Sequence, residues 1–570
     1  MLSKLLSSKW VIFCLLALVV FIVFGRAVWF DYVQLDEGIL LVNNKFFISD
    51  ISNIFEAFKH DINYPSNISP YYRPIFIVSF ILNSQFDSSP AVFYFGNILL
   101  HITAVYIVFL FFKELGFRKE VSFFSALLFA IHPAVTPVVV WVPGRIEAIL
   151  AIFTILSLVM FIRFIKTADW RYLFGFFGSF IIALLTKETV LGLIPILIFY
   201  YLTQRKEKER KISIILLSGL AAIIAVWFFV RKSVLLGANV SDVSFWQILV
   251  TLWSNSVAFI LYLGKAILPF NLSVLPALGG ISMLFYGFLA LLIILAVSWL
   301  IGKTKGNRTL LFPFDVRILG LLWFVVFLAP SLVGFYPTER MIFFEHRLYL
   351  PLVGIFIFFA GLMSGYSMSR YRRLLPVGIA VLFLFLSFNY SDSYRGRLVF
   401  WEKAVADSPQ VPQSHKGLAT AYLADDKLED AKEEFEEAIR LNPNERGVHL
   451  ILGLYLADLG QYDEAGEELK KEIEIDPNQF IAYHSLGRIS AFERNLGKAE
   501  EYFLKTLEIN PDYILAYQDL AVLYFSQNKH PQAVVQIKEL LKRQTVESLH
   551  PQIVKIIEIY AKETVLQMGF

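Results

Sequence analysis

The stretch 443-PNERGVHLILGLYLADLGQYDEAGEELKKEIEIDP-477 decides the fold of the last third of the chain. It begins and ends on a proline, and each half carries apolar residues at helical spacing. Proline returns at the same interval along the chain, at Pro409, Pro443, Pro477 and Pro511. Because proline cannot continue a helix, each of these residues marks the end of one unit. The spacing therefore predicts a tandem array of helix pairs.

The interval is 34 residues, which is the period of tetratricopeptide repeats (TPRs). We expect four full repeats over about 412–545, preceded by a half repeat over 393–411 and followed by a capping helix near 549–567. In the half repeat, Trp401 and Ala404 match the second helix of a pair. Stacked repeats form an extended surface that binds proteins, so a protein partner is expected on residues 393–570.

The preceding residues 1–392 have the composition of a membrane domain. The chain of 570 residues is 57% hydrophobic and holds 55 phenylalanines, and its long apolar runs lie in this part. We expect eleven membrane-spanning helices, because each run is near the length that crosses a bilayer. The runs lie at 10–30, 91–112, 121–139, 146–165, 171–186, 188–203, 212–230, 281–302, 317–335, 348–367 and 374–390. The predicted fold class is all-α, a polytopic membrane domain followed by a TPR solenoid.

Basic residues predict the orientation of these spans, since lysine and arginine gather in cytoplasmic loops. They cluster at Lys4 and Lys9, and within 113–119, 163–171, 205–211, 303–317 and 370–373. This arrangement predicts a cytoplasmic N-terminus, an uncleaved first span and an extracytoplasmic TPR domain. One more crossing at 246–270 would invert every later loop, so we expect a re-entrant or interfacial segment there.

Polar residues interrupt the apolar pattern mainly at the predicted outer face. They are Asp36 and Glu37, Tyr72 and Arg73, His132, Arg145 and Glu147, Lys187 and Glu188, Arg340, and Glu345, His346 and Arg347. Charged groups at membrane depth are costly and usually line a site. Each group also has a structural interpretation: ion pairs for Arg145–Glu147 and Lys187–Glu188, a helix end for His132, and lipid phosphate contacts for Arg340 and Arg347.

Several classes of function are excluded or disfavoured by composition and motifs. A net charge of +3 gives no indication of nucleic-acid binding. The single cysteine, Cys14, cannot form an internal disulfide. No glycine-rich nucleotide loop and no histidine or cysteine metal-ligand spacing is present. No cofactor is expected, and a divalent ion held by Asp36 and Glu37 stays open as an alternative.

Taken in order, the motifs resemble a known family over nearly the whole chain. They are Asp36-Glu37, Tyr71-Tyr72-Arg73-Pro74, His132-Pro133, Val142-Pro143-Gly144-Arg145-Ile146-Glu147, Thr186-Lys187-Glu188 and Glu345-His346-Arg347-Leu348-Tyr349-Leu350-Pro351. This order is similar to that of the transmembrane-and-TPR protein O-mannosyltransferases and their prokaryotic relatives, which have the GT-C glycosyltransferase fold. The resemblance implies a polyprenyl-phosphate sugar donor, a protein acceptor, and an outer-face site in a bacterial or archaeal plasma membrane.

The resemblance also implies a role for individual residues of this chain. Asp36 matches the position of the general base and Glu37 follows it, where animal relatives usually have a second aspartate. Arg73, Arg145, Lys187 and Arg347 are the candidates to bind the donor phosphate, supported by Tyr72, His132, Glu147, Glu188, Arg340, Glu345 and His346. Mannose is the default sugar. Two alternatives stay open: a non-catalytic TPR scaffold for envelope assembly, and a GT-C transferase that acts on a glycan or lipid.

Overall fold

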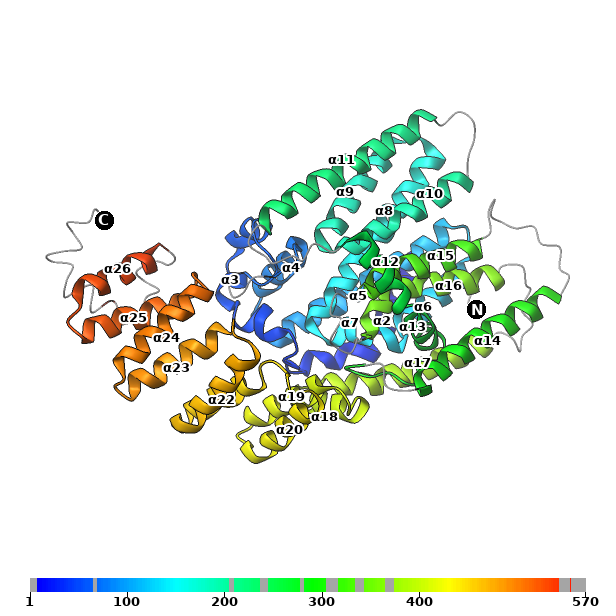
Figure 1. The fold of residues 1–570 in the computed structure, drawn as a ribbon. Helices are drawn as coiled ribbons and strands as arrows, with labels where there is room; N and C mark the ends of the chain where they lie inside the picture. Colours follow the sequence, from blue (N-terminus) through cyan, green and yellow to red (C-terminus); the bar gives the residue numbers. More distant parts are fainter. Residues whose placement is uncertain are drawn as a thin grey trace. The chain divides into compact units, whose positions relative to one another are not determined.

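The chain is helical throughout its described part, in agreement with the predicted fold class. The computed structural model describes residues 8–64, 69–203, 210–235, 244–276, 281–303, 316–333, 343–363, 374–542 and 554, and these residues form no strand (Figure 1). The chain divides into two compact units, Met1–Gln410 and Val411–Phe570.

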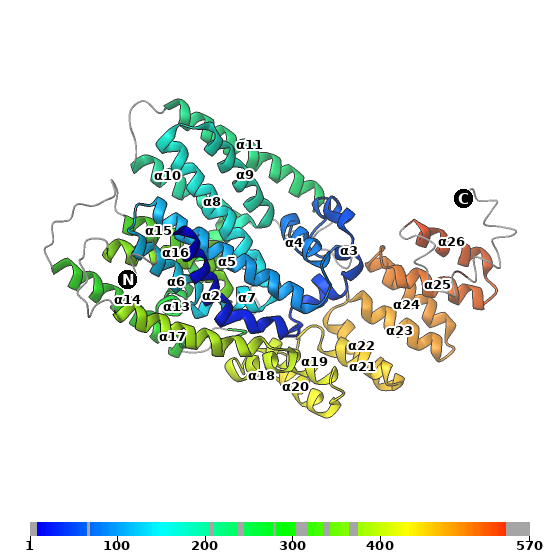
Figure 2. The ribbon, with the colours of Figure 1, turned by 180° about the vertical axis from the view of Figure 1, so that it is seen from behind.

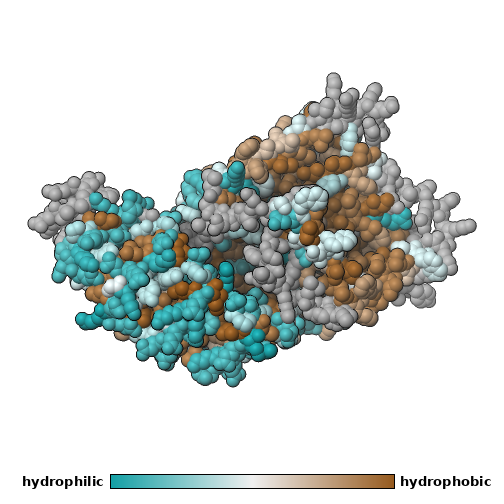
Figure 3. Space-filling view, in the orientation of Figure 1, coloured by the Kyte–Doolittle hydropathy of each residue, from teal (hydrophilic) through white to brown (hydrophobic). Residues whose placement is uncertain are grey.

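The described residues of the first unit form mainly apolar helices. Its helices are α2 (Lys9–Phe24), α3 (Lys45–Ser49), α4 (Pro74–Ser84), α5 (Pro90–Glu114), α6 (Lys119–Ala130), α7 (Thr136–Val140), α8 (Arg145–Thr167), α9 (Trp170–Thr186), α10 (Leu193–Thr203), α11 (Arg210–Val234), α12 (Phe245–Ser254), α13 (Val257–Ile267), α14 (Ile281–Lys303), α15 (Val316–Leu328), α16 (Tyr349–Met363), α17 (Leu374–Ser391) and α18 (Arg397–Asp407). Brown, apolar residues cover much of the visible face of this unit (Figure 3). Such an exposed apolar surface suits a lipid environment.

Six helical segments of the described residues are long and apolar enough to cross a membrane, and eight if two bent pairs are counted. The six are Lys9–Trp29, Pro90–Glu114, Val142–Thr167, Ile215–Val234, Glu345–Met363 and Pro376–Tyr394. Shorter apolar helices occupy the expected runs at 171–186, 188–203, 281–302 and 317–335. The total of eleven spans and their orientation stay predictions.

The core of the first unit forms where helices approach closely. Helix α5 packs against α2, α6 and α8, and α2 also contacts α17 (Figure 2). Helices α15 and α16 meet at Gly320 and Gly354, where a Cβ on Gly320 would lie 2.5 Å from the Gly354 carbonyl oxygen. The buried Trp323 indole donates to the Leu350 carbonyl at 2.8 Å across the same pair. Small residues permit this contact, as is usual between membrane helices.

Two helices of the first unit are interrupted. Lys119–Ala130 and Pro133–Val140 are bent by 55°, and Trp246–Ser254 and Val257–Ile267 by 52°. At the first break, His132 Nδ1 accepts from Ala134 N–H at 3.1 Å, and Nε2 donates to the Ala266 carbonyl at 3.1 Å. His132 is therefore a fully buried residue that ends a helix, as its structural interpretation supposed, and it offers nothing to a ligand.

The described residues of the second unit form four helix pairs with the spacing of TPRs, in agreement with the TPR solenoid of the predicted fold class. The pairs are α19 (Pro412–Leu423) with α20 (Leu428–Leu441), α21 (Val448–Asp458) with α22 (Tyr462–Ile475), α23 (Phe480–Phe492) with α24 (Leu496–Ile509), and α25 (Ile514–Ser526) with α26 (His530–Leu541). Small residues such as Ala431 and Ala465 are fully buried between the helices. The predicted capping helix at 549–567 lies outside the described residues, apart from Val554.

Helix α18 differs from the pattern that its sequence suggests. The proline spacing groups it with the TPRs, yet the first compact unit extends to Gln410 and includes it. Its buried residues Phe400 and Trp401 face the first unit: the Phe400 ring packs on Tyr394, and the Trp401 indole donates to the Val33 carbonyl at 3.2 Å.

Candidate active site around the first loop

The acidic pair lies in the loop between the first span and helix α3. Asp36 is exposed at the surface. The protein that surrounds its carboxyl removes part of the solvation and raises the pKa of that group above the usual range. Glu37 is fully buried. Its Oε2 accepts from Leu35 N–H at 3.0 Å, and Oε1 has no partner among the described residues. Burial, helped by the neighbouring Asp36, raises the pKa of Glu37 to about 7. The pair thus has an accessible carboxylate and a buried acid.

Two ion pairs join the segments that follow. Arg73, just before α4, contacts Glu188 at 2.9 Å and stacks over the Tyr71 ring, 4.2 Å from its centroid. Lys187 pairs with Glu147 of α8. Each ion pair therefore joins two different elements. The pairs between sequence neighbours, Arg145–Glu147 and Lys187–Glu188, do not form. Arg73 and Lys187 are only partly buried, so both cations remain near a surface.

Arg145 needs a correction with respect to its expected phosphate-binding role. Its side chain is fully buried, and its guanidinium makes four hydrogen bonds. It donates to Asn97 Oδ1 at 2.8 Å, Asn83 Oδ1 at 2.6 Å, Phe93 O at 2.7 Å and Ser79 O at 3.2 Å. These bonds tie α8 to α4 and α5, so the structure places Arg145 in the core, without an exposed face for a phosphate. Tyr72 is also structural, since its buried hydroxyl donates to the Phe58 carbonyl at 2.9 Å.

The Glu345–Arg347 motif forms a 3-10 turn, η10 (Glu345–Leu348), before α16. Glu345 is buried, pairs with Lys265 of α13 and accepts from Ser273 N–H at 3.1 Å. Arg347 donates to the Ser331 carbonyl at 3.2 Å and is partly exposed. His346 packs against Trp141, with ring centroids 5.3 Å apart. Arg340 lies outside the described residues.

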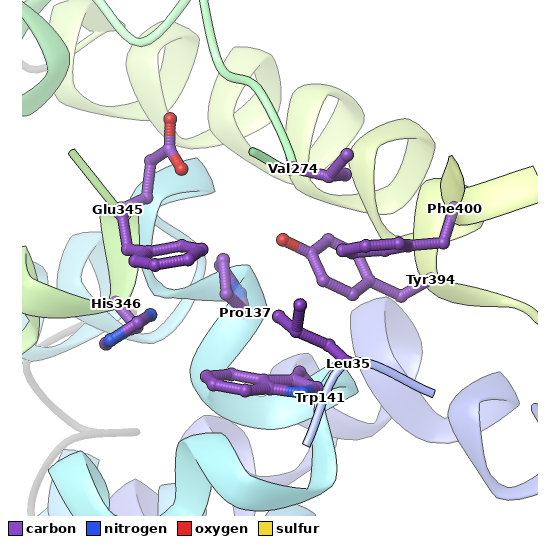
Figure 4. A pocket seen from close by; sticks show the side chains of 9 residues that line it. Leu35, Pro137, Trp141, Val274, Glu345, His346, Tyr394 and Phe400 are labelled. Carbon is purple, nitrogen blue, oxygen red and sulfur yellow. The ribbon is translucent and has the colours of Figure 1, made fainter. Parts of the chain in front are cut away.

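A small pocket brings the first loop and this motif together. Leu35, Pro137, Trp141, Val274, Phe344, Glu345, His346, Tyr394 and Phe400 line it (Figure 4). The Tyr394 hydroxyl points toward its middle, whereas the Glu345 carboxylate turns away from it. The residues that precede Asp36 and Arg347 in the chain therefore share one pocket. The charges of Lys187 and Arg347 both act on His346, so two candidate cations lie near the His346 wall of the pocket.

Sequence reasoning missed two participants. Lys265, the partner of Glu345, lies in the apolar segment 246–270 and was not considered as a polar residue of the site. Trp401 fits the repeat pattern, which hid its bond to the first loop. A lone lysine in an otherwise apolar helix was the available signal for Lys265. No signal in the spacing pointed to Trp401. Among the described residues, no group of three histidine, cysteine or carboxylate side chains could hold a metal ion.

Comparisons with known proteins match both parts of the chain. Residues 76–230 match the family described as dolichyl-phosphate-mannose-protein mannosyltransferase, and residues 416–480 and 481–513 match tetratricopeptide repeats. Protein O-mannosyl-transferase F38B6.6 of Caenorhabditis elegans is 23% identical over 401 residues, which is 66% of this chain and 55% of that protein. Protein O-mannosyl-transferase TMTC4 of Homo sapiens is 29% identical over 206 residues, covering 31% of this chain and 27% of its own.

The chain thus spans about half or less of the length of these relatives. The crystal structure of MamA, 21% identical, covers 31% of this chain and 96% of its own at a TM-score of 0.24. The matched regions follow the order expected from the motifs, and they confirm the resemblance to the protein O-mannosyltransferases, a mannosyltransferase-type membrane region followed by tetratricopeptide repeats.

Proposed function

We propose that the chain is a membrane glycosyltransferase that moves a sugar, by default mannose, from a polyprenyl-phosphate donor to a hydroxyl of a protein acceptor. The observation that carries the proposal is the acidic pair, where an exposed Asp36 stands beside the buried Glu37 in a loop at the edge of the first unit. The names of the matched relatives support transfer of mannose to protein. The assignment to the outer face of the membrane rests on the basic loops.

In the proposed reaction Asp36 is the general base. Its carboxylate takes the proton of an acceptor hydroxyl while the hydroxyl oxygen forms a bond to the anomeric carbon. The bond between that carbon and the phosphate oxygen breaks, and polyprenyl phosphate leaves with its negative charge. A single displacement inverts the anomeric centre. Because the leaving group is already an anion, no acid needs to protonate it.

The departing phosphate requires nearby positive charge. Arg73, Lys187 and Arg347 are the proposed donors of that charge, since each is only partly buried. Arg145 is withdrawn from this group because its hydrogen bonds are directed into the core. Glu188 and Glu147 orient Arg73 and Lys187 through their ion pairs. The TPRs are proposed to bind the acceptor protein.

Replacement of Asp36 by asparagine tests the proposal. In membranes supplied with a polyprenyl-phosphate mannose donor and a serine- and threonine-rich acceptor, Asp36→Asn is expected to lower turnover about 10²–10⁴-fold, the usual contribution of a general base. Asp50→Asn is the matched control: Asp50 follows α3, in the same connection between α2 and α4, and caps a turn by accepting from Ser52 N–H at 2.8 Å. An asparagine oxygen keeps that cap, so the control should retain activity.

The same experiment separates the enzyme from a non-catalytic scaffold. A scaffold has no use for a base and should tolerate Asp36→Asn in every assay. Near-normal transfer by this variant would remove Asp36 as the base, and no transfer by the unsubstituted chain with any polyprenyl-phosphate sugar would argue against the enzyme.

A further inference from the structure

The loop that carries Asp36 is fastened to the junction between α17 and α18. Three bonds hold residues that precede the acidic pair. Asp31 N–H donates to the Arg395 carbonyl at 3.1 Å, the Trp401 indole N–H donates to the Val33 carbonyl at 3.2 Å, and Arg397 donates to Gln34 Oε1 at 3.2 Å. Three of the four residues 31–34, which precede the acidic pair, are thus held by residues near the C-terminal end of the first unit.

The end of the first span, which precedes the loop, is held by the same segment. Arg26 forms an ion pair with Asp392 at 3.0 Å and donates to the Ser391 hydroxyl at 2.7 Å. Residue Leu35 completes the contact, because it shares the pocket with Tyr394 and Phe400. These points of attachment lie within residues 391–401, about 365 residues later in the chain. Two other contacts hold the same region: Arg26 stacks over the Phe388 ring of α17, and the Tyr94 hydroxyl of α5 donates to the Asp31 carbonyl at 2.9 Å.

The backbone has an unusual conformation at the point where the attachment holds the loop. Gln34 has a φ of 59°, in the left-handed region that a non-glycine residue adopts at a cost. Such a conformation persists only where the surroundings impose it. Here Trp401 holds Val33 and Arg397 holds Gln34, the two residues at the turn. The turn sets the direction in which the chain continues to Asp36.

Trp401 contributes a buried hydrogen-bond donor to these contacts. Its side chain is 7% exposed, and the indole N–H can only donate. Loss of that donor would leave the Val33 carbonyl without the partner that the structure gives it. The ring itself packs on Phe400, with centroids 5.1 Å apart, so a phenylalanine at this position would preserve most of the packing.

We propose that Trp401, with Arg397, is a positioning residue for the Asp36 base, so that the first helix of the repeat pattern sets the geometry of sugar transfer. This inference rests on the proposed function. Reaction rates are sensitive to placement, since a shift of about 1 Å in a catalytic group can cost about 100-fold in rate. In this proposal both residues act through their bonds to the loop.

The test is the variant Trp401→Phe in the full-length chain, with the same polyprenyl-phosphate mannose assay. We expect kcat to fall about tenfold while the KM for the donor stays unchanged, because a displaced base slows the chemical step but leaves donor contacts intact. Trp170→Phe is the matched control, since Trp170 is 53% exposed at the start of α9. The control should keep the kcat of the unsubstituted chain.

A double-mutant cycle distinguishes positioning from general damage. In an Asp36→Asn background, Trp401→Phe should lower the residual rate no further, because the base through which it acts is absent. A structural defect would lower it again. The partly exposed Arg397 gives a second variant, Arg397→Met, which removes the bond to Gln34 and should lower kcat about threefold at constant KM.

The outcomes separate this inference from the proposed function. An inactive Asp36→Asn together with Trp401→Phe and Arg397→Met at full kcat would overturn positioning and leave the enzyme intact. A rise in donor KM alone would also overturn it. Near-normal transfer by Asp36→Asn would instead overturn the base assignment itself.

Discussion

Glu37 is a fully buried carboxyl group, and one of its oxygens has no partner among the described residues. Such a group is buried most cheaply in its neutral form. The pKa of Glu37 is raised from 4.5 to about 7. Between these two values the folded chain holds the proton while the unfolded chain has lost it. Stability therefore falls as pH rises through this window.

The replacement Glu37→Gln should remove this dependence. Below pH 4.5 both states of the natural chain are protonated, and the burial penalty is absent. Above pH 7 the loss is complete and amounts to about 3 kcal/mol, at 1.36 kcal/mol for each unit of pKa. The glutamine side chain of the variant would stay neutral throughout. Thermal melting in detergent should therefore show similar midpoints at pH 5 and a higher midpoint for the variant at pH 8.

Glu188→Gln provides the comparison for that experiment, because Glu188 is held by the Arg73 cation. Its loss should not stabilise the chain at pH 8. Equal midpoints for Glu37→Gln and the unsubstituted chain at both pH values would mean that Glu37 is not buried as an acid.

At the scale of elements, the contact between α15 and α16 depends on two glycines. A Cβ on Gly320 would lie 2.5 Å from Gly354 O and 2.6 Å from Phe358 N. Both atoms belong to the backbone of α16, so neither can rotate away. Gly320→Ala should force the helices apart and lower stability by about 1–3 kcal/mol, the usual cost of overpacking.

Gly378→Ala is the control for that substitution. Gly378 lies in α17, and nothing occupies the space within 4 Å where its Cβ would be. Alanine favours a helix over glycine by about 1 kcal/mol, so this variant should melt at or above the natural midpoint. A Gly320→Ala variant that melts with the unsubstituted chain would show that the two helices do not depend on this close contact.

Elements were easier to predict from the sequence than the partners of single residues. The apolar runs located the membrane helices because length and hydropathy are local properties. Arg145 was misjudged because its partners Asn97 and Asn83 are 48 and 62 residues away. Lys187 likewise pairs with Glu147 rather than with its neighbour. A sequence places charges on elements, whereas only packing decides which charges meet.

At the scale of the molecule, the proline period predicted the four TPRs, because each repeat is specified by its own spacing. It could not show that α18 packs in the first unit, since the same small and aromatic residues suit either surface. The acidic pair was found through its place in an ordered set of motifs. Its attachment to residues 391–401 depends on contacts between distant parts of the chain, which no local pattern records.

Orientation in the membrane can be tested because the sequence has a single cysteine, Cys14. In a Cys14→Ser background, Ser526→Cys on α25 should react with a membrane-impermeant maleimide added to intact cells. Thr167→Cys, at the end of α8 in a basic segment, should react only after the membrane is broken. Both positions are exposed in the structure. The reverse pattern would place the TPRs in the cytoplasm and invert the predicted topology.

The two interrupted helices have a consequence for how the chain is made. The break at His132 is completed by the carbonyl of Ala266, which lies 134 residues later. A ribosome synthesises these residues after the first break has already entered the bilayer, where unpaired polar groups are costly. The His132 side chain therefore lacks this partner until Ala266 has been synthesised. Packing at this break thus depends on a residue near the middle of the chain, and substitutions at His132 should lower the yield of inserted protein before they affect its chemistry.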